Sequence, residues 1–595
     1  MRLCFGFFLT AAIWAQPQAP VREFTHNSQV MGEPRAYSAV LPSSYTASQK
    51  RYPVIYWLHG FETSAELQES ARETSAYVAA HDVIVVNAGP AETTGEFPLY
   101  FPELVEQADK NLRTIADRDH RAVTGYSAGG FVAFWVAGKF PDLVGSASSF
   151  MGPTEYTIGP KGFDVECNFD DFFANYDGIR TRLLTGSRDF LGFYHRRLNS
   201  IWSYTAPAHE TEEFDSGHGA PGIAKTLDFH MAAFAKPLPK PAVFSHADVY
   251  PNFGVWGWEV ASNRRRPAVT VLENVSRSGF RSAVREWIPS GTAIPEVQFS
   301  LTSPARLYAP ASVHPVTFLH LADGKVHRSN LKADSQGRLS FDLDGDAWEV
   351  GIGVEPVVSI IGYDLVDASW ATAGKPVKLR VKLFNKGGGR LPSLPVQWES
   401  PNPGVKLDAA PSRLFGLTAG ETATVPVSFT VADPARAIVK LVAVVGGARI
   451  PLVVPLFPAA EPTKDVQISD GRTFKVIHHA NQPDPETLGE GNSDGFAAPG
   501  ETFAILLPDG DAYRAAEVFT SDVCVDTSLR VSDSWVNYDH SGASVKYSLP
   551  RILPTCQPGT PIHMLARVVM PNAPNHQVRY FALEFPVWYR NEKQP

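Results

Sequence analysis

The chain has 595 residues, of which 44% are hydrophobic and 19% are charged, a balance typical of globular proteins with several packed cores. Its 53 Lys and Arg residues against 62 Asp and Glu residues give a net charge of −9. The chain has no basic tract, so this charge excludes a typical nucleic-acid-binding protein. At roughly 150 residues per domain, the length predicts about four domains.

The first 15 residues have the pattern of a secretory signal peptide. Arg2 supplies the positive start, residues 3–13 form an apolar run, and Ala15 is a small residue before the expected cut at Gln16. A buried N-terminal strand is the alternative. No later stretch has the roughly 18 uncharged apolar residues of a transmembrane helix. The sequence therefore predicts a secreted or periplasmic protein without a membrane span.

Apolar runs then alternate with helical patterns as far as residue 234. Residues 54–58 and 83–86 are continuous apolar runs, whereas residues 63–80 and 103–116 carry apolar side chains at helical spacing. Continuous apolar runs are typical of strands that are covered on both faces. The order of these elements predicts a doubly wound α/β fold with a mostly parallel sheet.

The most informative motif is the G-x-S-x-G string at residues 125–129. It follows an expected strand and opens an expected helix, which is the context of a nucleophile on a sharp turn. Gly125 and Gly129 leave room for that turn, and Ser127 is presented at the start of the helix. The alternative is a glycine-rich turn whose serine has no catalytic role.

Ser127 needs a base, because a hydroxyl is a weak nucleophile until its proton is removed. Residues 209–214 read as a strand, and His218 lies in the loop directly after it. Because the carboxyl ends of parallel strands meet at one edge of the sheet, we expect His218 close to Ser127. A surface histidine without a catalytic role is the alternative.

The third member must orient the imidazole and stabilise its cation. Asp189 follows the strand-like residues 182–186 and therefore lies at the same edge of the sheet. Asp215 is the other candidate for this role. The alternative for Asp189 is a non-catalytic ion pair with Arg188. We expect Asp189 to be the acid.

A tetrahedral oxyanion needs two hydrogen-bond donors. The N–H of Ala128, directly after the nucleophile, is the first that we expect. Gly60 permits a sharp turn after the strand at residues 54–58, so the N–H of Phe61 is the second candidate. A plain strand-to-helix turn at Phe61 is the alternative.

Beyond the Pro-rich residues 236–241, which read as a semi-rigid linker, helical periods nearly disappear. Residues 377–383 alternate apolar and polar side chains, as a half-buried antiparallel strand does. Turn signals recur at the short intervals typical of β-sandwiches. Every expected catalytic residue precedes the linker, so we expect residues 16–240 to fold and act alone.

Cys524 and Cys556 are separated by a span typical of a loop-closing disulfide. In an oxidising compartment they are expected to pair, with a stabilisation of roughly 3–4 kcal/mol in the chain-entropy model. Two buried thiols are the alternative. No cysteine and histidine spacing indicates zinc, and no metal or cofactor is expected at the catalytic site.

Residues 490–501 have the spacing of a calcium loop, with oxygen-bearing side chains at positions 1, 3 and 5 and Glu at position 12. However, Glu490 stands where Asp is usual, Pro499 lies inside the loop, and no helices flank it. A polar hairpin loop is the favoured interpretation.

Two groups of aromatic residues have alternative interpretations. The first group either lines an acyl pocket or packs beneath a loop. The second group either forms a sugar-stacking platform or is buried in a β-sandwich core. The groups are Tyr156, Phe163, Phe169 and Phe172, and the pair Trp256 and Trp258.

Three segments together resemble the esterase D-type α/β-hydrolases, namely YPVIYWLHG at residues 52–60, GYSAGGF at residues 125–131 and GHG at residues 217–219. That family includes feruloyl and acetylxylan esterases, S-formylglutathione hydrolases, siderophore esterases and mycolyltransferases. The resemblance covers about residues 22–236. Residues 377–389 resemble the adhesion-type immunoglobulin-like modules of bacterial secreted proteins.

The family pattern implies Ser127 as the nucleophile, His218 as the base and Asp189 as the acid, in the chain order of the α/β-hydrolase fold. Many relatives carry an aromatic residue soon after the histidine, whereas Ala220, Pro221 and Gly222 follow it here.

The sequence thus predicts a multidomain protein, an α/β-hydrolase followed by β-sandwich domains. The expected division is a signal peptide at 1–15, the esterase domain at 16–237, a β-rich domain at 238–353, an immunoglobulin-like sandwich at 354–458 and a C-terminal sandwich at 459–595.

The expected activity is that of a secreted serine carboxylesterase that needs no cofactor. Export and appended β modules favour esters of small molecules or of polysaccharides, such as feruloyl or acetyl esters, with contact to a cell wall or carbohydrate through the β domains. The alternatives are an acyltransferase or peptidase with the same triad, and a non-catalytic carbohydrate-binding or adhesion protein.

Overall fold

The computed structural model describes most of the chain, in fourteen stretches. These are residues 19–90, 97–163, 165–205, 208–289, 291–353, 357–402, 404–408, 412–432, 437–463, 467–476, 484–509, 511–536, 542–570 and 577–588. The signal-peptide prediction for residues 1–15 lies outside the described residues.

An eight-stranded sheet forms the centre of the N-terminal region, in the order β1-β2-β4-β3-β5-β6-β9-β10. From β4 to β10 neighbouring strands are parallel, and β1 and β2 are antiparallel at one edge. The strands are β1 (Val21–Asn27), β2 (Pro34–Val40), β3 (Val54–His59), β4 (Ile84–Pro90), β5 (Arg121–Tyr126), β6 (Ser146–Phe150), β9 (Arg180–Gly186) and β10 (His209–Phe214).

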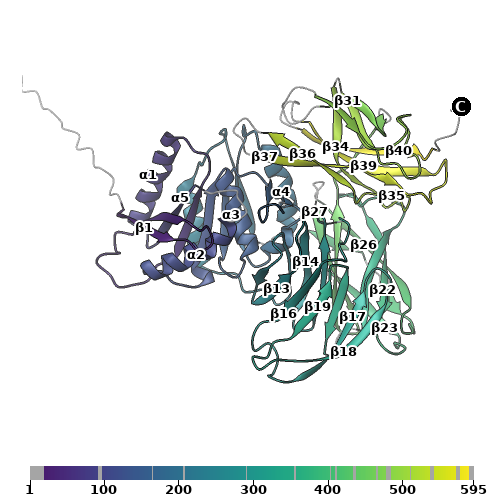
Figure 1. Cartoon of the computed structure of the whole chain (residues 1–595), viewed down its shortest axis with the longest axis horizontal. Coiled ribbons are helices and arrows are strands. Elements are labelled where there is room, and N and C mark those ends of the chain that lie inside the picture. Colours follow the sequence, from purple (N-terminus) through teal and green to yellow (C-terminus); the bar gives the residue numbers. More distant parts are fainter. Residues whose placement is uncertain are drawn as a thin grey trace, which may run out of the picture.

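Helices cover both faces of this sheet (Figure 1). Strand β3 shows why, since Tyr56 packs with α2, α3 and α4 in one core, whereas Ile55 and Trp57 pack with α1 and α5 in another. The helices are α1 (Ser64–Ala80), α2 (Phe97–Asn111), α3 (Ala128–Lys139), α4 (Gly192–Thr205) and α5 (Ile223–Ala235). The predicted doubly wound α/β fold with a mostly parallel sheet is confirmed.

Short elements complete the N-terminal region. The hairpin of β7 and β8 pairs antiparallel apart from the main sheet. These elements are η1 (Arg118–His120), β7 (Glu155–Ile158), β8 (Val165–Asn168) and η2 (Phe173–Tyr176).

Strands dominate the rest of the described chain, as predicted. The first β region consists of a six-stranded sheet in the order β11-β14-β15-β20-β17-β18 and a four-stranded sheet in the order β12-β13-β16-β19. Its strands are β11 (Phe244–Asp248), β12 (Phe253–Val255), β13 (Trp258–Ser262), β14 (Val269–Ser276), β15 (Gly279–Arg285), β16 (Gln298–Thr302), β17 (Val313–His320), β18 (Val326–Lys332), β19 (Ser340–Asp344) and β20 (Trp348–Ile352).

The second β region has two four-stranded sheets, β21-β22-β26-β24 and β25-β23-β27-β28. Alternating side chains of β22 are buried, and they share one apolar core with β27 and β28. The strands are β21 (Val358–Leu365), β22 (Val377–Asn385), β23 (Leu394–Glu399), β24 (Val405–Leu407), β25 (Ser412–Leu414), β26 (Thr422–Val431), β27 (Ala437–Val445) and β28 (Ala448–Leu456).

The last β region is built on an eight-stranded sheet that contains β29, β40, β39, β34, β31 and β32, with β30 and β33 off this path. Two further strand pairs are β35 with β38 and β36 with β37. The bounds are β29 (Glu461–Pro462), β30 (Gln467–Ser469), β31 (Arg472–Val476), β32 (Asp484–Leu488), β33 (Ala504–Asp509), β34 (Asp511–Phe519), β35 (Val525–Asp526), β36 (Arg530–Val536), β37 (Gly542–Ser548), β38 (Arg551–Ile552), β39 (Pro561–Met570) and β40 (Gln577–Pro586).

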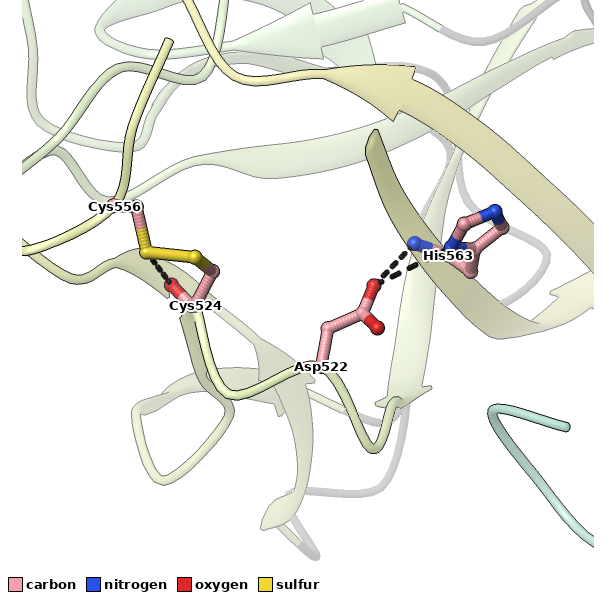
Figure 2. Close-up of a disulfide and its surroundings, with 4 residues drawn as sticks. All are labelled: Asp522, Cys524, Cys556 and His563. Carbon is pink, nitrogen blue, oxygen red and sulfur yellow. Dashed lines mark hydrogen bonds and ion pairs between the residues drawn. A yellow bond between two sulfur atoms is a disulfide. The ribbon is translucent and has the colours of Figure 1, made fainter. Parts of the chain in front are cut away.

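A disulfide joins Cys524 to Cys556, with Cα atoms 5.4 Å apart, and the predicted pairing is confirmed. Figure 2 shows that Asp522, two residues before Cys524, points to the start of β39, where its Oδ2 accepts the N–H of His563 at 2.6 Å. The disulfide and this bond together fix the β34–β35 connection. Cys167 is buried and forms no disulfide within the described residues.

The α/β core continues into the first β region. Ala247, Val249 and Tyr250, in and just after β11, belong to the same buried cluster as the helices α2, α3 and α4. At the C-terminal end of α3, the buried ammonium of Lys139 lies 2.5 Å from a carboxylate oxygen of Asp248. The linker at residues 236–241 therefore separates two sheets without separating their cores.

The C-terminal region also packs on the α/β domain, next to α4 (Figure 1). Arg197 of α4 lies 2.8 Å from Glu155 of β7 and 3.2 Å from Glu517 of β34, and it also pairs with Asp170. Glu517 in turn lies 2.6 Å from Arg567 of β39. All of these side chains are nearly or fully buried, so the contact is an integral part of the molecule.

Within the described parts of the chain, no helix is both long enough and apolar enough to cross a membrane.

Candidate active site

Ser127 occupies the tight turn between β5 and α3, with φ +51° and ψ −123°. Such a conformation is strained for a residue with a side chain and needs close support from its surroundings. A Cβ at Gly125 would lie 2.2 Å from the Gly129 carbonyl oxygen, and one at Gly129 would lie 2.2 Å from that of Leu58. Glycine is therefore required at both positions for the turn to form.

The structure brings the three predicted triad residues together. His218 Nε2 lies 3.0 Å from Ser127 Oγ, and His218 Nδ1 lies 3.1 Å from Asp189 Oδ1. The Asp189 side chain is fully buried, and the same oxygen accepts the N–H of Leu191 at 3.0 Å. In this arrangement Ser127 donates to His218, and His218 donates to Asp189, which is the order that removal of the serine proton requires.

Asp215, the rival acid, lies outside this chain of hydrogen bonds. Its side chain is 88% exposed and pairs with Arg188, and it accepts a hydrogen bond from Ser187 Oγ at 3.2 Å. The ion pair of Arg188 is thus with Asp215, and Asp189 is left to face the imidazole.

Two contacts that the sequence analysis did not anticipate hold His218. The ring of Phe190, which directly follows Asp189, lies 4.8 Å from the imidazole between centroids, and the ring of Tyr126 lies at 5.2 Å. In the next residue of the loop, the N–H of Gly219 donates to Met151 Sδ at 3.2 Å. Phe190 provides an aromatic contact that the Ala220-Pro221-Gly222 stretch does not supply.

The loop that carries Phe61, the second predicted oxyanion donor, packs against the turn that carries Ser127 and Ala128. A Cβ on Gly60 would lie 2.9 Å from Ser127 Cβ and 3.2 Å from the Ala128 nitrogen, so the two turns are in close contact. Among the described residues, neither the N–H of Phe61 nor that of Ala128 donates to another protein atom. Both donors are therefore free for an oxyanion.

Burial and nearby carboxylates together set the electrostatics of the site. Burial raises the pKa of Tyr126, and the negative charges of Glu66, Glu62 and Asp189 raise it further, so its hydroxyl stays protonated. Behind Asp189, burial lowers the pKa of His195 to about 4. His195 is hydrogen-bonded to Thr185 and to the Gly152 carbonyl, at 3.0 and 2.9 Å, and is neutral at pH 7.

Three of the four aromatic residues considered for an acyl pocket pack against helix α3. Tyr156, Phe169 and Phe172 are at most 8% exposed and pack on Phe131 and Trp135 of α3. Helix α3 has an apolar residue at almost every position, so it needs a cover on the side away from the sheet. The packing alternative is therefore correct for these three residues.

The tryptophans of the first β region are also buried, Trp256 at 6% exposure and Trp258 at 3%. Both belong to the apolar core of that region. A sugar-stacking platform needs exposed rings, so the structure supports the packing interpretation.

The loop at residues 490–501 is organised by backbone N–H groups. The buried carboxylate of Asp470 accepts the N–H groups of Asp494 and Gly495 at 3.1 and 3.0 Å. Glu501 accepts those of Asn492 and Ala498, both at 3.2 Å. Oxygens that a calcium ion would need are thus used within the loop, which favours the hairpin interpretation. The described stretches contain no cluster of three or more metal-ligating side chains.

A cavity of about 930 Å³ lies between the domains, away from the triad. Its lining includes Trp287, Tyr363, Trp370 and Lys440. It contains none of the three triad residues, so it is separate from the candidate active site.

The N-terminal region matches a known family model. Residues 28–95 and 101–222 match the family model described as "Putative esterase", which covers Ser127, Asp189 and His218. A curated esterase of Mycobacterium tuberculosis H37Rv, Esterase Rv1288, is 30% identical over 135 residues, or 20% of this chain. The match spans 28% of that relative's own length.

Solved structures similar to this region are esterases and related hydrolases. A ferulic acid esterase is 21% identical, with 36% of this chain and 99% of that chain covered and a TM-score of 0.32. One from the anaerobic fungus Anaeromyces mucronatus is 20% identical, with 37% and 91% covered and a TM-score of 0.31. An S-formylglutathione hydrolase from Staphylococcus aureus is 13% identical, with 37% and 100% covered and a TM-score of 0.31.

Proposed function

We propose that this chain, whose residues 28–95 and 101–222 match the esterase family model, is a serine carboxylic ester hydrolase that works through an acyl-enzyme. The observation that carries the proposal is the continuous hydrogen-bond chain from Ser127 through His218 to Asp189, at 3.0 and 3.1 Å. Two unused N–H groups beside the nucleophile complete the requirements for acyl transfer.

The first half of the reaction forms the acyl-enzyme. Ser127 Oγ attacks the ester carbonyl carbon while His218 Nε2 takes the hydroxyl proton, and the carbonyl electron pair moves onto the oxygen. The N–H groups of Phe61 and Ala128 stabilise that oxyanion. When it collapses, the C–O bond to the alcohol breaks, and His218 returns its proton to the leaving oxygen.

The second half repeats these steps with water. His218 removes a proton from the water molecule as it attacks the acyl carbon, and the tetrahedral intermediate then releases the acid and restores Ser127. Asp189 accepts the Nδ1–H throughout, so it keeps the ring oriented and stabilises the imidazolium. None of these steps calls on a cofactor.

For the substrate we propose uncharged carboxylic esters of small molecules or polysaccharides, with feruloyl and acetyl esters as the leading classes. The entrance of the site supports this, because Phe61 and Phe190 are 66% and 50% exposed beside the nucleophile and the base. Exposed phenyl rings offer an apolar or aromatic acyl group a surface to pack on.

Secretion and contact with a cell wall or carbohydrate through the β domains are part of the same proposal. They rest on the signal-like N-terminal pattern and on the disulfide, which is typical of proteins from oxidising compartments.

A panel of p-nitrophenyl and hydroxycinnamoyl esters tests the proposed function. Wild type should turn over at least one of them, and Ser127→Ala should abolish turnover with an unchanged melting temperature. Ser43→Ala is the matched control, since its hydroxyl bonds the Ala79 carbonyl far along the chain from the triad. A fluorophosphonate should label wild type and Ser43→Ala only. Turnover by Ser127→Ala near the wild-type rate contradicts the assignment.

A further inference from the structure

Glu62 lies in the loop between β3 and α1 and is buried beside the candidate oxyanion site. Its side chain is only 1% exposed. One carboxylate oxygen, Oε2, lies 3.0 Å from His59 Nδ1 and accepts the N–H of Gly60 at 3.1 Å. Within the described part of the chain, the other oxygen, Oε1, has no hydrogen-bond partner.

These two hydrogen bonds close a small ring around Phe61. Residues 59 and 60 are tied to residue 62, so the peptide unit between them has little freedom. Gly60 is at the same time pressed against the nucleophile turn, where a Cβ would lie 2.5 Å from the Tyr126 carbonyl oxygen. Phe61 directly follows this contact, and its N–H donates to no other protein atom among the described residues.

Burial of a carboxylate with one unpartnered oxygen is costly. Its negative charge also lies near the place where the reaction develops an oxyanion, and it already acts on the pKa of Tyr126. Such a group opposes catalysis through its charge. Its compensating contribution is the geometry that the two Oε2 hydrogen bonds impose on the loop.

We propose that Glu62 is a positioning residue that orients the Phe61 N–H toward the oxyanion of the tetrahedral intermediate. The inference rests on the proposed esterase function and adds a residue that the sequence motifs did not indicate. Its role lies in the hydrogen bonds that it accepts and not in its charge, and two substitutions separate these properties.

Glu62→Ala removes both hydrogen bonds. Misplacement of a single oxyanion donor should lower kcat by about tenfold to a hundredfold with little change in KM, because the N–H acts on the transition state. Glu62→Gln retains an acceptor oxygen for both N–H groups and removes the charge, so kcat should stay within about threefold of wild type. A kcat that is lost in Glu62→Ala and retained in Glu62→Gln shows that the hydrogen bonds of Glu62, and not its charge, support catalysis.

A transition-state analogue provides a second measurement. A trifluoromethyl ketone adds to Ser127 and places an oxyanion between the two donors, so its affinity should fall in Glu62→Ala by the same factor as kcat/KM and remain in Glu62→Gln. Fluorophosphonate labelling and the melting temperature report whether each variant is folded. If Glu62→Ala does not fold, the analogue affinity of Glu62→Gln alone decides, and a loss of about tenfold or more overturns the proposal.

Glu103 of α2 is the matched control. It also holds a loop through backbone N–H groups, those of Gln29 and Val30, both at 3.1 Å, and its side chain is 12% exposed. Glu103→Ala should lower stability without changing kcat or the affinity of the analogue.

The outcomes distinguish the inference from the function on which it rests. A wild type that turns over no ester in the panel removes the proposed function and this inference with it. Esterase activity that Glu62→Ala leaves unchanged overturns the inference alone. A Glu62→Gln variant as impaired as Glu62→Ala also overturns it, because the charge would then carry the effect.

Discussion

At the residue scale, both local sequence and tertiary contacts were needed to identify the acid of the triad. Asp189 and Asp215 both follow parallel strands and lie at the same edge of the sheet, so position alone does not separate them. The structure separates them by burial, since the Asp189 side chain is fully buried against His218 and Asp215 is 88% exposed.

We expect Asp189→Asn to lower kcat by about three to four orders of magnitude, because the imidazole loses the group that orients it and stabilises its cation. Asp215→Asn removes only a solvent-exposed partner of Arg188, and its kcat should stay within about threefold of wild type. Steady-state kinetics of the two variants on one soluble ester provide the measurement. A severe loss in Asp215→Asn with a mild one in Asp189→Asn would reverse the assignment.

At the scale of elements, helix α5 is attached to the sheet by a buried histidine. His230 is fully buried, with Nδ1 2.9 Å from Ser146 Oγ and Nε2 2.9 Å from Ser148 Oγ on β6. The Ser148 hydroxyl donates to Thr124 of β5, so it accepts the Nε2–H of a neutral imidazole. Burial lowers the pKa of His230 to about 3.

This arrangement predicts a loss of stability in acid. The unfolded chain takes up the His230 proton below its ordinary pKa of about 6.5, whereas the folded protein does not do so until about pH 3. Stability from this residue is thus complete above pH 6.5 and declines as the pH falls. By pH 5 the free energy of unfolding should drop by about 2 kcal/mol through His230 alone.

Urea unfolding at pH 7 and pH 5 measures this effect. His230→Gln retains hydrogen-bonding groups without a proton to take up, so it should lose about 2 kcal/mol less than wild type between the two pH values. Buried His195 and half-buried His209, each with a pKa lowered to about 4, should still lower the stability of the variant in acid. An equal loss in both proteins would show that His230 titrates normally in the folded state.

At the scale of the whole molecule, the α/β domain depends on its neighbours more than the Pro-rich linker suggested. The sequence analysis led us to expect an autonomous fragment of residues 16–240. In the structure, however, buried Lys139 finds its counter-charge in Asp248, and Arg197 finds one of its partners in Glu517. Both partners lie beyond the end of that fragment.

We therefore expect residues 16–240 to be insoluble or to unfold without cooperativity. Loss of one partner of a buried ion pair costs about 3–5 kcal/mol, and the apolar surface under β11 becomes exposed as well. Solubility, thermal unfolding and hydrolysis of a small soluble ester should be compared with the full chain.

The same fragment with Lys139→Met tests the origin of that instability. The substitution removes the buried cation whose counter-charge, Asp248, is missing from the fragment, so this variant should be more soluble than the unmodified fragment. If residues 16–240 are instead soluble and active within about tenfold of the full chain, a difference of roughly 1.4 kcal/mol in barrier, the β domains are dispensable for the fold and the chemistry.

Prediction from sequence worked where the signal is local in the chain. The continuous apolar runs of β3 and β4 and the glycines around Ser127 predicted a parallel sheet and a nucleophile turn, because strand burial and a tight turn each constrain adjacent residues. The positions of Ser127, Asp189 and His218 after expected parallel strands were sufficient to place all three at one sheet edge.

What the sequence by itself determined is therefore the α/β class of the first region, the strand-rich character of the rest, the turn that carries Ser127, the approach of His218 to it and the disulfide. The two oxyanion donors stay predictions. The tertiary structure alone decided between Asp189 and Asp215, assigned Tyr156, Phe169 and Phe172 to packing on α3, and revealed Phe190, Met151 and Glu62 around the site. It also showed that the α/β core continues into the β regions. The physical reason is that these features depend on burial and contact between segments distant in the chain, which local patterns do not encode.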